Sequence, residues 1–97
     1  MISLERWKNF DIRQQMGHIT SELTRAAGWE GKQDILSRNE SLVRALELIG
    51  LTVECYTKTR RREIARLKEV TASLLDETRA YQVELRDLVS YGMRFIL

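Results

Sequence analysis

The stretch DIRQQMGHITSELTRAAGW, residues 11–29, decides the fold. Its apolar residues recur at steps of four, three, four and three, so an α-helix would place them on one face. These residues are Ile12, Met16, Ile19, Leu23 and Ala26. Asp11 and Gln14 have the spacing of a capping box, in which the Asp oxygen accepts from a first-turn amide and the Gln side chain reaches back. The stretch predicts a helix from about Ile12 to about Trp29.

A second amphipathic stretch follows. Gly28 and Gly31 offer the left-handed or loose backbone that closes the first helix, and Asp34 or Ser37 can cap the next one. The apolar face expected for this helix consists of Ile35, Leu42, Val43, Leu46, Ile49 and Val53. The charged residues expected to face water are Arg38, Glu40, Arg44 and Glu47.

The last third of the chain contains two further apolar stripes. The first comprises Ile64, Leu67, either Val70 or Thr71, Leu74 and Leu75. The second comprises Tyr81, Leu85, Leu88 and Val89. The polar run from Asp76 to Arg79 can form a bend between them, but the pattern is equally compatible with one continuous rod.

Composition and loop lengths extend this prediction to the whole chain. Proline is absent and only five of the 97 residues are glycine, so helix breakers are scarce. The connections near residues 29–33 and 56–60 are short, which favours antiparallel neighbours. The sequence predicts an all-α fold, an up-and-down bundle of three or four antiparallel helices, in a single domain over residues 1–97.

Bulk properties exclude several classes of protein. Hydrophobic residues are 43% and charged residues 31%, a globular composition, and the formal charge of +2 is too small for general attraction to nucleic acid or anionic membrane. No apolar stretch approaches the roughly 20 residues of a membrane span. Glu5, Arg6 and Lys8 interrupt any signal peptide, and Cys55 alone cannot form an intramolecular disulfide. A soluble cytoplasmic protein without a membrane partner is predicted.

Catalytic signatures are also missing from the sequence. It has no phosphate-binding Gly-Lys-Ser/Thr loop, no dinucleotide glycine string, no Gly-x-Ser-x-Gly elbow and no cysteine pair for zinc. A metal site in a bundle would need Glu-x-x-His pairs, and none occurs. His18 and Cys55 could form a nucleophilic pair only if they met across helices, and both are expected to pack. The sequence therefore predicts no enzyme and no cofactor.

The C-terminal segment is unusually apolar for a chain end. It either folds back on its own bundle or forms a subunit interface, since apolar residues on more than one face need a second covering surface. The candidate interface of a homodimer comprises Tyr81, Leu85, Leu88, Tyr91, Met93, Phe95, Ile96 and Leu97.

The segment from Lys58 to Lys68 contains six basic residues and one acidic residue. These candidate contacts for an anion or nucleic acid are Lys58, Arg60, Arg61, Arg62, Arg66 and Lys68. Such a cluster can bind phosphates by charge and counterion release, although charge runs on helices are usually solvated faces. Basic residues at a helix start oppose the helix dipole, which favours a binding role over a role in helix stability.

Two resemblances to known groups bear on function. Arg13 and His18 form an Arg-x-x-x-x-His string that resembles the motif of the HEPN group of helical ribonucleases. That resemblance implies phosphate stabilisation by Arg13 and acid–base chemistry by His18 in a dimer cleft. The motif here lies early in the chain, and Thr20 stands where the family often has tyrosine.

The central half of the chain resembles small uncharacterised prokaryotic helical proteins. The similar segments are a Trp-Glu-x-Lys turn at Trp29–Lys32 and an Arg-Ala-Leu-Glu-Leu-Ile helix at Arg44–Ile49. This resemblance supports the helical fold and implies no mechanism. The leading functional hypothesis is a non-catalytic protein–protein interaction or assembly module that acts as a homodimer. The alternative is a nucleic-acid-associated protein, RNA-binding or toxin–antitoxin-like of the HEPN type, that uses the basic cluster at 58–68.

Overall fold

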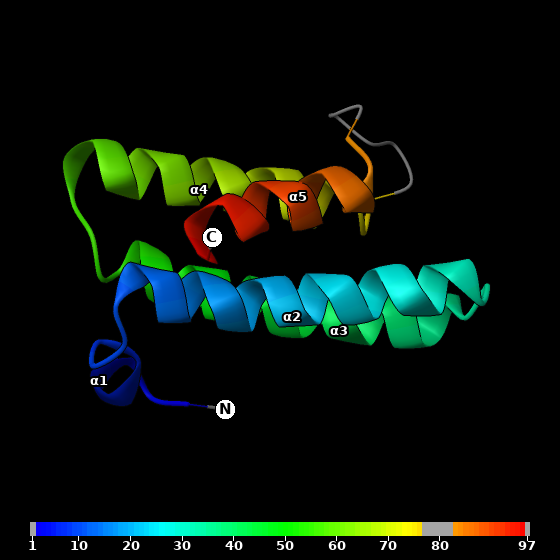
Figure 1. Cartoon of the computed structure of the whole chain (residues 1–97), viewed down its shortest axis with the longest axis horizontal. Coiled ribbons are helices and arrows are strands. Elements are labelled where there is room, and N and C mark those ends of the chain that lie inside the picture. Colours follow the sequence, from blue (N-terminus) through cyan, green and yellow to red (C-terminus); the bar gives the residue numbers. More distant parts are fainter. Residues whose placement is uncertain (1, 77–82, 97) are drawn as a thin grey trace.

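The computed structural model of the chain describes residues 2–76 and 83–96. Over these residues the chain forms five α-helices and no strand (Figure 1). The helices are α1 (Leu4–Trp7), α2 (Ile12–Gly31), α3 (Ile35–Val53), α4 (Lys58–Ser73) and α5 (Leu85–Ile96). The prediction of an all-α fold is confirmed.

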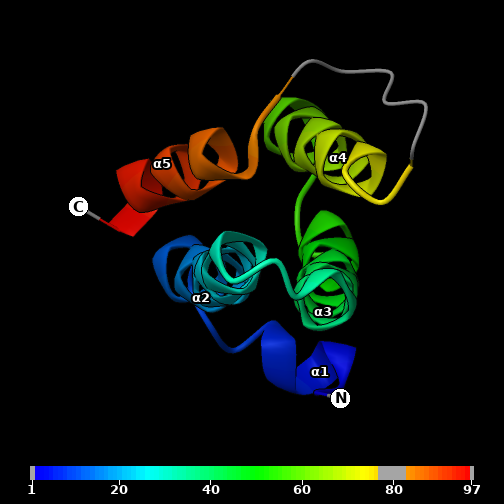
Figure 2. The same cartoon turned by 90° about the vertical axis from the view of Figure 1, so that its right-hand side faces the viewer.

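The four long helices form a bundle in which successive helices run in opposite directions (Figure 1). Viewed down the bundle, α2 and α3 lie side by side, α5 lies on α2 and α4 lies on α3 (Figure 2). The single turn α1 touches α3. Backbone contacts between α4 and α5 are sparse. The bundle is therefore closely packed through α2 and α3, and loosely joined between α4 and α5.

The start of α2 is fixed by the capping box expected from the sequence. The backbone N–H of Gln14 donates to Asp11 Oδ1 at 2.8 Å, and the backbone N–H of Asp11 donates to Gln14 Oε1 at 3.0 Å. Each bond satisfies an amide that the helix itself leaves without a partner. The next helix is capped by Asp34, which accepts from the N–H of Ser37 at 3.0 Å.

The end of α2 differs from the glycine closure expected from the sequence. The backbone N–H of Gln33 donates to the carbonyl of Glu30, and that of Asp34 donates to the carbonyl of Trp29, which together form a Schellman motif. The left-handed residue of this motif is Gln33, with φ of 61°, and no glycine has a positive φ. Gly28 and Gly31, which were expected to supply the left-handed backbone, both lie within the helix instead. That expectation was wrong.

Replacing Gln33 with glycine should raise the free energy of unfolding by about 0.5–1 kcal/mol, because glycine lacks the Cβ that crowds a left-handed backbone. Urea unfolding followed by circular dichroism measures the change. Gln33→Ala is the control, since it removes the amide but keeps Cβ. An equal gain in both variants would trace the effect to the glutamine side chain and contradict a backbone origin.

The buried face of α3 is rotated from the predicted one. Leu42 and Ile49 are buried as expected, but Ile35 and Val43 are 50% and 44% exposed. The observed buried face comprises Arg38, Ser41, Leu42, Ala45, Ile49 and Thr52. Apolar periodicity alone cannot identify this face, because three of its six members are polar and the alanine is small.

Arg38, expected to face water, instead joins three helices. Its Nη2 donates to the carbonyl of Leu74 at the end of α4, at 2.6 Å, and its Nη1 lies 3.2 Å from Glu30 Oε2 in α2. The side chain is only 10% exposed. Cationic groups are favourable at the C-terminal end of a helix, where carbonyls lack intrahelical partners, so Arg38 ties α4 to the α2–α3 pair.

The last two apolar stripes belong to two separate helices, α4 and α5. In α4 the core position is taken by Thr71, which is fully buried, while Val70 is half-buried at the side of the helix. Ile64, Leu67 and Leu74 are buried as expected, whereas Leu75 is 36% exposed. The bend predicted at 76–79 lies outside the described residues beyond position 76.

Candidate functional site

The six basic residues of the cluster do not share one face of α4. At about 100° per residue, Lys58, Arg62 and Arg66 fall within about 80° of one another, while Arg61 and Lys68 lie on the side next to α3. Arg61 Nη2 is 3.7 Å from Glu54 Oε1. Arg60 points inward. Its guanidinium lies 5.4 Å from the Phe95 ring centroid, and Nη1 is buried without a hydrogen-bond partner. Nucleic-acid binding by this cluster stays a prediction.

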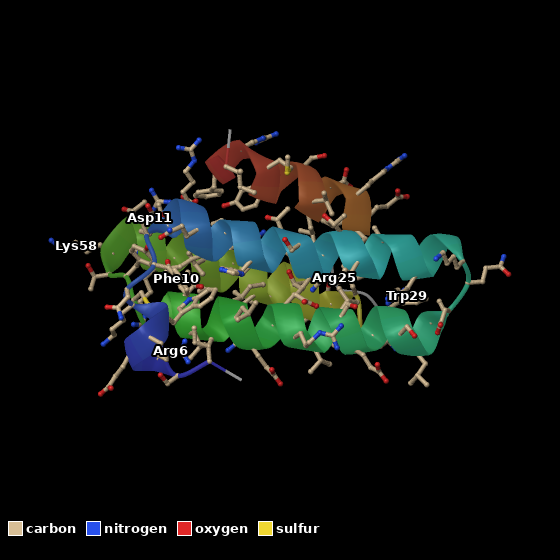
Figure 3. The ribbon with its side chains drawn as sticks, turned by 60° about the horizontal axis from the view of Figure 1, so that its bottom comes forward. Arg6, Phe10, Asp11, Arg25, Trp29 and Lys58 are labelled. Carbon is tan, nitrogen blue, oxygen red and sulfur yellow. The ribbon has the colours of Figure 1, made fainter. Side chains whose placement is uncertain are left out.

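Arg13 and His18 lie on different sides of α2, about 140° apart around the helix. Arg13 Nε donates to the carbonyl of Ile96 at the end of α5, at 2.8 Å. The ring of His18 instead packs against Trp7 and Phe10, at centroid distances of 5.7 and 5.3 Å. Figure 3 shows Phe10 between α1 and the start of α2. One copy of the chain does not bring the two side chains of the HEPN-like string together.

Cys55 also lacks contact with His18. Its thiol donates to the carbonyl of Leu51 at 3.4 Å and receives the side-chain amide of Gln15 at 3.7 Å. The same Gln15 accepts from the hydroxyl of Tyr56 at 2.7 Å. Cys55 therefore belongs to a polar network that joins the α3–α4 connection to α2. Among the described residues, no group of three or more His, Cys, Asp or Glu side chains could hold a metal ion.

The C-terminal apolar residues are largely covered by their own bundle, because α5 packs on α2. Leu85 and Leu88 are buried, and Tyr91, Phe95 and Ile96 are half-buried. Of the described members of the candidate dimer interface, only Met93 is exposed, at 38%. Tyr81 and Leu97 lie outside the described residues. A dimer through this segment stays a prediction; among its described members, Met93 is the one that is exposed without any opening of the bundle.

An apolar surface groove lies between α4 and α5. This groove has a volume of about 390 Å³. Its described lining is Glu63, Arg66, Leu67 and Val70 from α4, and Val83, Asp87, Leu88 and Tyr91 from α5 and the residues before it. Leu67 and Leu88 are buried at its floor, whereas Glu63, Arg66 and Asp87 are exposed at its rim.

One end of the groove is closed by aromatic contacts. The Tyr91 hydroxyl donates to Glu63 Oε1 at 3.0 Å, and its ring meets Phe95 edge-on at a centroid distance of 5.5 Å. Burial, followed by the hydrogen bond to Glu63 and its negative charge, raises the pKa of Tyr91 to about 12. Tyr91 is therefore protonated at neutral pH and keeps donating to Glu63. This clamp joins α4 and α5 at that end of the groove.

The sequence did not single out this groove as a site. Val70 and Val83 line it, and neither could be assigned to it without knowing that α4 packs on α3 while α5 packs on α2. The choice between Val70 and Thr71 offered one sequence signal for the groove, because only one of these two neighbours can face the core. Since Thr71 does so, the apolar Val70 is left at the edge of the neighbouring groove.

Comparison with known proteins adds no relative from which a function could be carried over. The chain matches no protein-family model, no curated protein and no solved structure. In the described part of the chain, no helix has the length and apolar character needed to cross a membrane.

Proposed function

We propose that the chain is a non-catalytic protein-interaction module that binds an amphipathic helix of a partner protein in the groove between α4 and α5. The observation that carries this proposal is the separation of the two helices. Each packs on a different member of the α2–α3 pair (Figure 2). Apolar side chains from both walls therefore stay accessible between them.

The spacing of the lining residues favours a helical ligand. On α4 the groove residues lie at positions 63, 66, 67 and 70, and on α5 at 87, 88 and 91, which is the three-to-four-residue repeat of a helix face. A third helix laid along such walls can insert side chains at i, i+3 or i+4, and i+7 between them. An aliphatic side chain in the centre would contact Leu67, Val70 and Leu88.

The rim of the groove supplies charge for orientation. Arg66 and Glu63 lie on the α4 side and Asp87 on the α5 side. Charges around an apolar centre contribute to the choice and register of a partner more than to its affinity. A ligand helix with an acidic residue toward Arg66 and a basic residue toward Asp87 fits this pattern.

The polar groups of the groove support binding in preference to catalysis. Glu63 accepts from the Tyr91 hydroxyl, and Asp87 Oδ2 accepts from the backbone N–H of Glu84 at 3.1 Å as part of the start of α5. Both carboxylates thus have structural partners at the rim. A nucleophile with an adjacent base, as covalent catalysis requires, is not formed by the described lining residues.

Val70→Lys tests the proposal, because the lysine side chain would extend across the groove and carry a positive charge into it. Val70 is only half-buried, so the amine can still reach water and the variant should fold. The probe is a peptide selected from a displayed library of amphipathic helices. We expect the variant to weaken its binding at least about tenfold by calorimetry, since a charge in an apolar contact must be desolvated.

Met93→Lys is the matched control, since Met93 is an exposed apolar residue of α5 that does not line the groove. It should bind the peptide like the unmodified chain, and circular dichroism should show that both variants are folded. The proposal fails if the library yields no helical binder, or if the selected peptides bind Val70→Lys and the unmodified chain equally well.

A further inference from the structure

A second surface lies along the outer edge of α3, on the opposite side of α4 from the groove. The residues of α3 that point away from the core are spaced at four, three and four: Val43, Glu47, Gly50 and Glu54. Val43 is 44% exposed, and both glutamates are exposed. Glu47 has no ion-pair partner among the described residues. This stripe alternates small or apolar positions with acidic ones.

The adjacent edge of α4 has the complementary composition. Its residues, with the same spacing, are Arg61, Ala65, Lys68 and Ala72. Two contacts place this stripe beside the first within one chain: Arg61 Nη2 lies 3.7 Å from Glu54 Oε1, and Lys68 Nζ lies 3.7 Å from where a Cβ at Gly50 would be. Because α3 and α4 are neighbours (Figure 2), the two stripes form one face along the α3–α4 seam.

We infer that this seam face binds a second copy of the chain, with α3 of each copy lying across α4 of the other. A two-fold axis parallel to the helices does not change the height of a residue along the bundle, so equivalent residues of the two copies lie at the same height. The part of α4 that lies beside α3 in one copy is then the part that meets α3 of the second copy. Because α3 and α4 are antiparallel within the chain, they are also antiparallel across this contact (Figure 1).

The antiparallel alignment matches the two stripes position by position. It places Val43 opposite Ala72, Glu47 opposite Lys68, Gly50 opposite Ala65 and Glu54 opposite Arg61 of the second copy. Both acidic residues meet basic ones, and the glycine and two alanines permit the close helix approach that such packing needs. The symmetry repeats every pair, so the face is complementary to itself. Exposed apolar Leu36 and Leu75 extend it at one end.

This arrangement also gives a role to Arg61, a basic residue near the start of α4. At that position it opposes the helix dipole, so its placement is not explained by the stability of α4 alone. In the dimer, Arg61 and Lys68 would face carboxylates of the second copy. The contact uses the side of α4 opposite to Val70, so the dimer would carry two open α4–α5 grooves, and the inference does not depend on what those grooves bind.

Ala72→Arg tests the contact. Ala72 is exposed in the single chain, so the variant should fold. In the dimer the arginine would keep the two helices apart sterically and would place a charge in their contact. Sedimentation velocity over a range of protein concentrations measures the monomer–dimer equilibrium. We expect the unmodified chain to dimerise and Ala72→Arg to be monomeric. Ser90→Arg, which alters an exposed small residue of α5, should dimerise like the unmodified chain.

Exchanging the charges of one proposed pair distinguishes this dimer contact from any other. Glu47→Lys and Lys68→Glu should each raise the dissociation constant of the dimer at least about tenfold, because each places like charges opposite one another twice. The double variant should return it to within about threefold of the original value. A monomeric unmodified chain, a dimer that survives Ala72→Arg, or a double variant no better than the single ones would overturn the inference.

Discussion

Replacing Gly92 with alanine is expected to destabilise the protein by about 1–3 kcal/mol, the usual range for overpacking a closely packed contact. Gly92 is buried where α5 crosses α2. A Cβ added there would overlap Thr20 Oγ1 and would lie 3.1 Å from Thr20 Cβ and 3.2 Å from Thr20 Cγ2. Rotating the threonine about χ1 can remove the Oγ1 contact, but it does not move Thr20 Cβ, which stays too close, so the two helices must still move apart by a few tenths of an ångström.

Gly17→Ala is the matched control for this prediction. Gly17 also lies in a helix, but a Cβ there would meet no atom within 4 Å. It should stabilise the protein by about 0.5–1 kcal/mol through the higher helix propensity of alanine. Urea unfolding of both variants gives the comparison. Equal stabilisation by the two substitutions would mean that α5 does not approach α2 this closely.

Thr20→Ala provides a second check on the same contact. Thr20 Oγ1 is buried without a hydrogen-bond partner, so removing the hydroxyl and the methyl group opens space at little polar cost. In a double-mutant cycle, Gly92→Ala should be clearly less destabilising in the Thr20→Ala background. A coupling energy of about 1–3 kcal/mol is expected for residues in such direct contact. Simple additivity would place the strain of Gly92→Ala elsewhere.

Sequence periodicity was sufficient for most of the fold because the strongest stripes are also the most buried ones. Met16, Ile19, Leu23 and Ala26 are all fully buried in α2, and its capping box marks the start of the helix. The all-helical class and the antiparallel order follow from such features. They are local properties, determined by residues within one or two turns of each other.

The prediction failed where tertiary partners changed the meaning of a residue type. Arg38 is buried because the carbonyl of Leu74 and the carboxylate of Glu30 are within its reach, and neither partner is close in sequence. Trp7 is 1% exposed and lies in a one-turn helix that precedes the first predicted one. A single polar or isolated residue does not form a periodic apolar pattern. Its burial therefore cannot be predicted from the sequence pattern and is seen only in the folded chain.

The candidate surfaces could be predicted only in part, because they too depend on tertiary contacts. The basic segment was visible in the sequence, but its division into an inward Arg60, a seam-facing pair and an outer group follows from the position of α3 and α5 around α4. The α4–α5 groove is a property of two helices separated in sequence. The apolar C-terminal segment was expected to be covered either by its own bundle or by a second subunit, and α2 covers much of its described part.

The two proposed surfaces would act together if both are used. A dimer joined through the α3–α4 seam carries two grooves on one particle, and two linked sites bind a bivalent partner more tightly than either site alone when the geometry allows both to be filled. Ala72→Arg should remove this gain without changing the affinity of one groove for one peptide. Val70→Lys should remove peptide binding without changing dimerisation.

Replacing Trp7 with alanine is expected to have the largest effect on stability, about 3–5 kcal/mol, the usual range for truncating a buried aromatic residue. The indole Nε1 donates to Thr52 Oγ1 at 2.9 Å, and the Trp7 carbonyl accepts from Gln15 Nε2 at 3.0 Å. The ring also packs edge-on against Phe10 at 5.6 Å. A helix of one turn is not stable by itself, so α1 should detach from α3 when the contacts of the indole are lost. The backbone bond to Gln15 does not depend on the Trp7 side chain and remains possible in the variant.

Trp29→Ala is the control, since this second tryptophan is 36% exposed and its ring contacts the amine of Lys32 at 5.1 Å. Its loss should cost less than about 1 kcal/mol, because exposed aromatic and cation–π contacts contribute little. In Trp29→Ala, Trp7 is also the only tryptophan left, so its fluorescence reports the α1–α3 contact directly during urea unfolding. A change of under 1 kcal/mol in Trp7→Ala would show that α1 contributes little to the fold, whereas a loss several times that of Trp29→Ala would make α1 part of the cooperative core.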